Sequence, residues 1–181
     1  EGCLKKAHEL NDNDFEVHRL MAEVNLSGRN FRVAERHASK AYKMVPNDPR
    51  VLSVYGEVSL RLGKIDQGLD ALKLALEIDP IAQGKTNSDS RTAPVIFGEF
   101  LARNKDNCLE LVEKLEDIDS KSWLLTAKLC SDEEHDITEE DWYKRGKEEF
   151  NDKDWAAEVD SFRLNNEGAK DSLIEFAESL F

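Results

Sequence analysis

The first part of the sequence repeats itself with a period of 34 residues, and this regularity constrains the fold more than any other feature. Met21-Ala22 returns one period later as Tyr55-Gly56. Three positions held by a small residue or a proline return in the same way: Ala34 as Gly68, Ala41 as Ala75, and Pro46 as Pro80. Repeats of this length stack on one another, because a single copy cannot bury its own apolar face. We therefore expect an array of similar units.

Each period is predicted to form two helices. Its apolar and small residues fall into two stripes at helical spacing: Leu52, Tyr55, Ser59 and Leu62, then Leu69, Leu72, Ala75 and Leu76. Gly63-Lys64 separates the two helices, and Pro80 ends the second because the residue before a proline avoids the helical conformation. Asp48 is predicted to cap the first helix, with Pro49 in its first turn.

Small residues are predicted where the two helices of a hairpin approach each other closely. Gly56 and Gly68 occupy such positions, as do Ala22 and Ala34 one period earlier. Glycine inside a helix costs about 1 kcal/mol relative to alanine. Its presence at two facing positions indicates that close packing outweighs helix propensity here.

This order of large, small, aromatic and proline positions resembles the tetratricopeptide repeat (TPR). The two matching repeats span Phe15–Asp48 and Pro49–Ala82, and Glu1–Asn11 looks like the second half of a truncated repeat. His18 and Leu52 depart from the pattern, since the family prefers tryptophan there. The resemblance implies an all-α fold in which antiparallel helix hairpins stack as an α-solenoid with a right-handed superhelix.

The regularity ends after residue 82, which suggests three parts: regular repeats at 1–82, a polar loop at 83–92, and degenerate helical hairpins at 93–181. In the last part, Ala93–Asp119 is interpreted as a third hairpin with a stripe of Leu109, Val112, Leu115 and Ile118. Residues 138–166 again resemble a TPR hairpin, with Gly146 at the small position.

Helix-start signals are less clear in this second half. Ser120 is expected to cap a short helix, and Thr138 followed by Asp141 resembles a capping box. Asp171–Phe181 is predicted to be a last amphipathic helix. The chain opens inside a predicted helix at Glu1 and stops without a helix-ending signal, so we expect an excerpt of a longer protein, whose upstream part could carry a targeting segment.

Composition excludes two classes of partner. The net charge is −13, and nearly all the excess of acidic residues falls in 83–181, which would repel nucleic-acid phosphates. Charged residues make up 35% of the chain, and no apolar run approaches the roughly 20 residues that span a membrane, so we expect no membrane insertion. A basic protein partner and simple solubility both remain open as reasons for the acidity.

No residue pattern indicates catalysis, a cofactor or a metal site. Cys3, Cys108 and Cys130 lie far apart without a CxxC pair, which fits a reducing, cytoplasmic compartment. The histidines are scattered, and His18 is predicted to pack in the core. The acidic runs at 11–14 and 132–134 lack a complete calcium-binding loop. The neighbours Glu139 and Glu140 are expected to point to different sides of a helix.

The TPR resemblance implies a partner site in the concave groove that the first helix of each repeat lines. The groove positions combine apolar and charged residues: Arg19, Leu20, Glu23, Arg50, Val54, Glu57, Leu60 and Arg61. Leu20, Val54 and Leu60 are expected to lie outside the core with charges around them, which is typical of a protein-binding surface. Glu23 and Val54 disfavour the carboxylate clamp with which some family members hold a chaperone tail.

The leading hypothesis is a scaffold for protein–protein interaction that binds a protein or peptide. One alternative is a non-catalytic helical domain of a larger enzyme, such as a glycosyl- or methyl-transferase. Another is a repeat protein that self-assembles. For the groove itself, the alternative to a partner site is a solvated face whose charges form local ion pairs.

Overall fold

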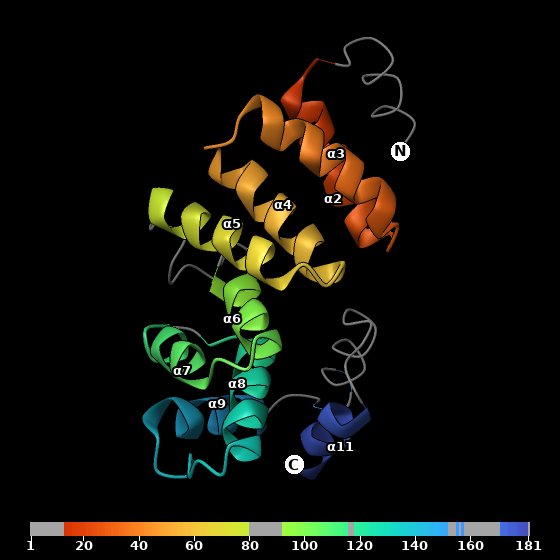
Figure 1. The fold of residues 1–181 in the computed structure, drawn as a ribbon. Helices are drawn as coiled ribbons and strands as arrows, with labels where there is room; N and C mark the ends of the chain where they lie inside the picture. The colour runs from red at the N-terminus through yellow and green to blue at the C-terminus, as the bar shows by residue number, and fades with distance from the viewer. Residues whose placement is uncertain are drawn as a thin grey trace. The chain divides into compact units, whose positions relative to one another are not determined.

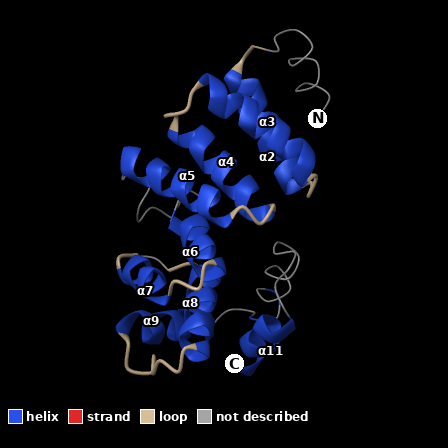
Figure 2. Ribbon diagram, in the orientation of Figure 1, coloured by secondary structure: helices blue, strands red, loops and turns tan. Residues whose placement is uncertain are grey.

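The computed structural model describes residues 13–79, 92–115, 118–151, 155, 157 and 171–180. These residues form α-helices joined by turns and contain no β-strand, so the predicted all-α fold is confirmed for them (Figures 1 and 2). The chain separates into two compact units, Glu1–Gln83 and Gly84–Phe181. The predicted half-repeat at Glu1–Asn11 and most of the predicted polar loop lie outside the described residues.

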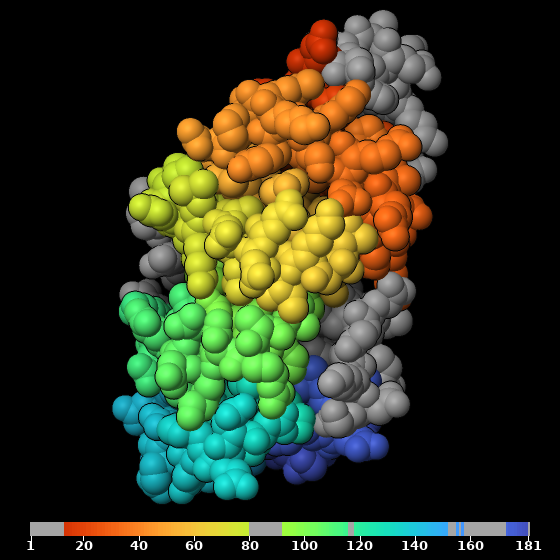
Figure 3. Space-filling model, viewed as in Figure 1, coloured from red at the N-terminus to blue at the C-terminus, as the bar shows by residue number. Residues whose placement is uncertain are grey.

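Within residues 13–79, the first unit contains two helical hairpins. Helix α2 (Phe15–Ser27) pairs with α3 (Phe31–Met44), and α4 (Pro49–Arg61) pairs with α5 (Ile65–Ile78). Every boundary of the first hairpin returns 34 residues later in the second. Helix α4 also packs against α3 and α2, and the side chains of α3, α4 and α5 close the spaces between their ribbons (Figures 1 and 3).

Helix starts and turns in this unit follow local chemistry. The Asp48 carboxylate accepts hydrogen bonds from the backbone N–H of Arg50 at 2.9 Å and of Val51 at 3.2 Å, as a helix cap does. Asp14 caps α2 in the same way. Gly63 ends the turn of the second hairpin with φ of +76°, a conformation that glycine adopts without strain. The predicted cap and turn are therefore confirmed.

The two helices of the second hairpin cross at a pair of glycines. A Cβ atom on Gly56 would lie 2.5 Å from Leu72 Cγ and 2.9 Å from the Gly68 carbonyl oxygen. A Cβ atom on Gly68 would lie 2.7 Å from Leu60 Cδ2 and 3.0 Å from the Gly56 carbonyl oxygen. Real Cβ contacts are essentially never shorter than 3.0 Å, so the predicted close approach of these helices is confirmed.

Small residues also fill the contact between the two hairpins. Ala22, Ala34 and Ala38 of the first hairpin are buried against Val54 and Val58 of α4. Nearby, the rings of Tyr42 and Tyr55 stack with their centroids 4.5 Å apart. Small side chains on one helix leave room for the branched side chains of the next, which lets neighbouring hairpins pack at interior density.

A pair of histidines is buried inside the first hairpin. His18 of α2 is fully buried, His37 of α3 is nearly so, and their Nδ1 atoms lie 2.9 Å apart. One ring therefore donates an N–H and the other accepts it. The expectation that His18 packs in the core is confirmed, and its partner is a residue that the repeat pattern does not single out.

Replacing His18 by leucine should lower the free energy of unfolding by about 1–2 kcal/mol, because His37 loses this partner in a buried site. The double replacement His18→Leu with His37→Leu should cost less than the sum of the two single changes, because it removes both members of the pair. Urea denaturation followed by circular dichroism measures all four proteins. Strictly additive losses would contradict a coupled pair.

In the second unit, the other described helices surround α8. The described helices are α6 (Thr92–Leu101), α7 (Lys105–Glu113), α8 (Ser120–Asp132), α9 (Asp141–Asn151) and α11 (Asp171–Ser179). Helix α8 packs against α6, α7, α9 and α11, and eight of its residues are buried. Its buried residues form the centre of one aromatic and aliphatic core that includes Trp123, Trp142 and Phe150.

Gly146 of α9 lies at a close approach, and its neighbour is a tryptophan. A Cβ atom there would lie 2.2 Å from Trp123 Cδ1. The Trp123 ring is fully buried, and its Nε1 donates to the Tyr143 carbonyl oxygen at 3.2 Å. The close partner of Gly146 is therefore α8, which precedes it in sequence. Most of the predicted second helix of the 138–166 hairpin lies outside the described residues.

Several predicted helix boundaries in the second unit are wrong. Thr92 belongs to α6 and is buried, so it is not part of a loop. Helix α7 ends at Glu113, so Leu115 and Ile118 reach the core from the connection that follows it.

Two predicted caps are also wrong. The cap of α8 is Asp119, whose carboxylate accepts from the Ser122 backbone N–H at 2.8 Å, while Ser120 is already helical. Thr138 donates both its N–H and its hydroxyl to Asp136, at 3.0 and 2.7 Å, so it closes a turn before α9. Aspartate competes with the neighbouring hydroxyl residues at these sites because a carboxylate is the stronger acceptor.

Candidate functional site

The predicted groove residues lie on the first helices of the two hairpins. Arg19, Leu20 and Glu23 are half-buried on α2, and Arg50 is exposed at the start of α4. Glu57 and Arg61 are half-buried farther along α4. Because α2 and α4 contact each other, residues from successive hairpins contribute to the same region of the first unit.

Ion pairs join most of the charged groove residues. The Arg19 guanidinium donates to Glu16 through Nε at 2.9 Å and Nη2 at 2.8 Å, and Nη1 donates to Glu23. This hydrogen bonding holds the pKa of Glu16 below its usual range. Across the two helices, Arg50 Nη1 lies 3.6 Å from Glu16 Oε1. Arg19 is thus occupied by its own helix, whereas the Arg50 side chain keeps an exposed fraction of 51%.

Two of the eight predicted groove residues are part of the core, so the expectation that they are free is wrong. Val54 has an exposed fraction of 7% and packs against Ala22, Ala34 and Ala38 of the preceding hairpin. Leu60 has an exposed fraction of 4% and occupies the space that the missing side chain of Gly68 leaves. Both turn inward because neighbouring helices offer small residues at these points. Leu20 is the one predicted apolar groove residue that remains partly exposed.

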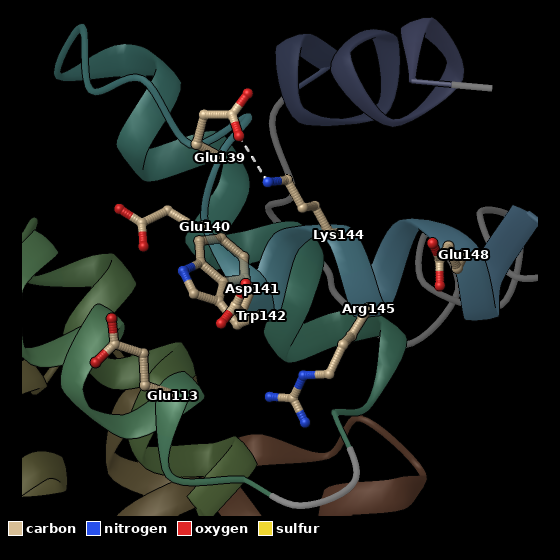
Figure 4. A pocket seen from close by; sticks show the side chains of 8 residues that line it. All are labelled: Glu113, Glu139, Glu140, Asp141, Trp142, Lys144, Arg145 and Glu148. Carbon is tan, nitrogen blue, oxygen red and sulfur yellow. Dashed lines mark hydrogen bonds and ion pairs between the residues drawn. The ribbon is translucent and has the colours of Figure 1, made fainter.

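The second unit contains an acidic hollow that the sequence did not reveal. It has a volume of about 620 Å³ and is lined by Glu113 of α7 and by residues before and within α9: Glu139, Glu140, Asp141, Trp142, Lys144, Arg145 and Glu148 (Figure 4). Glu139 and Glu140 lie in the turn before α9. The expectation that they lie on a helix is wrong, but their carboxylates do point apart, Glu139 toward Lys144 and Glu140 away from it (Figure 4).

The charges of the hollow are only partly balanced. Lys144 Nζ lies 2.7 Å from Glu139 Oε2, and this hydrogen bond raises the pKa of the lysine. His135 Nε2 lies 3.5 Å from Glu140 Oε1. Among the described residues, neither Glu113 nor Glu148 takes part in an ion pair. The only signal in the sequence was the acidic run at 139–141, which turn and capping chemistry explains equally well.

One polar atom in the wall of the hollow lacks a partner. Trp142 has an exposed fraction of 2%, and its Nε1 donates no hydrogen bond to any residue that the structure describes. In Figure 4 the indole nitrogen faces the side of the hollow where Glu140 and Glu113 lie. A buried N–H without an acceptor costs about 1–3 kcal/mol, so such groups are uncommon.

The buried carboxylate of Glu99, unlike the Trp142 N–H, has hydrogen-bond partners. Glu99 of α6 is fully buried, and its carboxylate accepts hydrogen bonds from the side chains of Asn104 at 2.7 Å and Asn107 at 3.1 Å. The amide donors come from the turn and first residues of α7. Glu99 therefore fastens the α6–α7 hairpin, and sequence spacing alone did not identify it.

The cysteines and acidic residues do not form a reactive or metal-binding centre in the described part of the chain. Cys108 and Cys130 are free and buried, and burial raises the pKa of the first thiol to about 12 and of the second to about 11. Few thiolates form at such values, so both behave as apolar residues. No group of three or more His, Cys, Asp or Glu residues is placed to hold a metal ion there.

Comparison with known proteins leaves the family open. No protein-family model matches the chain, and no match emerges from the curated proteins. None of the described helices has both the length and the apolar character needed to cross a membrane.

Proposed function

We propose that the first unit is a tetratricopeptide-like segment of a right-handed α-solenoid and that it acts as a scaffold for protein–protein interaction, with no catalysis of its own. The architecture is supported by helix boundaries that return after 34 residues and by the close glycine crossing of α4 and α5. Both features belong to a chain that stacks equal hairpins.

One observation carries the proposal: the first helices of successive hairpins contact each other and are joined at their surface by the Glu16–Arg50 pair. In a hairpin array, such a row of first helices forms a surface to which each repeat adds a few side chains. That surface here has a half-buried leucine, Leu20, next to charged residues. This is the composition of a protein interface with an apolar centre and a polar rim.

The proposed partner is an extended peptide or a helix with one apolar side chain that packs on Leu20. Arg19 and Glu23 are already paired within α2, so they orient the surface. Arg50 is more exposed and lies over two carboxylates, Asp48 and Glu16. A carboxylate of the partner would compete with these acids for the Arg50 guanidinium, which has donors in several directions.

Capture experiments with the full chain test this surface. The variant Leu20→Glu with Arg50→Gln should retain at least one captured protein about tenfold less than the parent does, which corresponds to about 1.4 kcal/mol. Immobilised protein, a cell lysate and quantitative mass spectrometry provide the measurement. A melting curve for each variant shows that the fold is retained.

The matched control, Met44→Glu with Arg32→Gln, also replaces one apolar residue by glutamate and one arginine by glutamine, but on α3, the second helix of the hairpin. Both residues are exposed on α3, so this variant should capture the same proteins as the parent. If no captured protein distinguishes the two variants, the α2–α4 surface is not the binding site. Light scattering of the three proteins is also measured at increasing concentration. If the parent and the control self-associate and the α2–α4 variant does not, the partner is a second copy of the chain.

A further inference from the structure

The acidic hollow of the second unit has a charge balance that favours a cationic ligand. Its wall contains five carboxylates and two basic side chains, and one of these, Lys144, is held by Glu139. Carboxylates that surround a concave space reinforce one another's potential and attract positive charge. This unit also holds nearly all the excess negative charge of the chain. An acidic surface alone is no binding site, because acidity also keeps proteins soluble.

The second observation is the buried indole N–H of Trp142. The ring forms part of the wall, and its Nε1 finds no acceptor within the described part of the chain. The Trp142 N–H needs an acceptor, such as a neutral or anionic oxygen, and a simple cation does not supply one. The complete ligand therefore carries a positive group and an acceptor oxygen a short distance apart.

The volume of the hollow and the placement of its acidic residues limit which ligands fit. No three acidic or histidine residues in the described ranges are placed around one metal ion, and a volume of about 620 Å³ lies within the range of pockets that hold organic groups. A lysine or arginine residue within a peptide meets both requirements. Its side chain supplies the cation, and the main-chain carbonyl next to it supplies the acceptor.

We propose that this hollow binds a lysine- or arginine-bearing peptide segment of a partner protein. The basic side chain lies between Glu113 and Glu140, which Figure 4 shows on the side of the hollow that the indole nitrogen faces, and the Trp142 N–H donates to a main-chain carbonyl oxygen of the segment. Neighbouring atoms cover the N–H, so the side chains around it move aside as the segment enters. The site belongs to the second unit and does not depend on the α2–α4 surface.

Fluorescence anisotropy with the full chain tests the proposal. The probe is a labelled, end-blocked alanine-based peptide with a central Lys-Arg pair, and the reference peptide has Gln-Gln in its place. The parent should bind the basic peptide at least tenfold more tightly than the reference. Glu113→Gln with Glu140→Gln should remove most of this preference. Trp142→Phe should weaken binding of the basic peptide about threefold or more. Spermine has no carbonyl, so it should bind the parent and Trp142→Phe equally well.

The control variant, Glu134→Gln with Glu175→Gln, removes the same charge from exposed positions of the same unit outside the hollow. It should bind the basic peptide within twofold of the parent. Equal weakening by both double variants would overturn the proposal, because it would indicate attraction to net charge alone. Equal affinity of the parent for both peptides would also overturn it. If Trp142→Phe unfolds, as circular dichroism would reveal, the comparison of the two glutamate variants decides by itself.

Discussion

Replacing Gly56 with leucine should lower the free energy of unfolding of the first unit by about 2–4 kcal/mol, through overpacking. The added Cβ alone would come within 2.5 Å of Leu72 Cγ and 2.9 Å of the Gly68 carbonyl oxygen. Leu72 is fully buried and cannot turn into solvent, and the carbonyl belongs to the helix backbone. The two helix axes must therefore separate, which loosens the contacts along their whole crossing.

The alanine variant gives the sharper test of this packing, because two effects have opposite signs. Helix propensity alone predicts that Gly56→Ala stabilises the helix by about 1 kcal/mol, whereas the contact distances predict a loss. Urea denaturation followed by circular dichroism measures the difference. Glu77→Leu, at an exposed position of α5, is the control and should change stability little. A Gly56→Ala protein more stable than the parent would show that α4 and α5 do not approach as closely as described.

Replacing Val54 with glutamate should also unfold the first unit, at a cost of about 3 kcal/mol or more. Val54 has an exposed fraction of 7% and lies in one buried apolar cluster with three alanines of the preceding hairpin, so a carboxylate there loses most of its water. From the repeat pattern alone, this residue would belong to the partner-binding groove, and its replacement would change binding without changing stability.

The comparison with Leu20→Glu separates these two roles. Leu20 is half-buried at the surface of α2, where a carboxylate keeps much of its water, so we expect a loss below about 1 kcal/mol. Chemical denaturation of both single variants provides the measurement. If the two variants were equally stable, Val54 would belong to the groove surface, which would contradict its placement between the hairpins.

Local signals predicted the helices of the first unit well. Asp48 and Pro49 start α4, Gly63 turns the chain, and the residues before Pro46 and Pro80 end the second helices near 44 and 78. Each signal acts within about four residues, so a sequence pattern can detect it. The same approach failed at Ser120, where Asp119 is the cap, and at Thr138, whose N–H and hydroxyl donate to Asp136 in the turn before α9.

The candidate sites were less predictable, because they depend on which elements meet. Position in a repeat correctly placed Leu20 and Arg50 at the surface of the first helices, yet it also placed Val54 and Leu60 there. Whether a side chain on the edge of a helix is buried depends on the size of the residues facing it, and here those are Ala22, Ala34 and Gly68.

The sequence by itself determined the all-α fold, the 34-residue spacing of the helices in the first unit, and the close approach at Gly56 and Gly68. Those properties follow from backbone geometry and from side-chain patterns within a single hairpin. Only the tertiary structure decided that Glu113 of α7 joins the residues before and within α9 around one hollow, with the Trp142 N–H in its wall. Residues separated by many positions come together only through packing against α8, and no local pattern encodes that meeting.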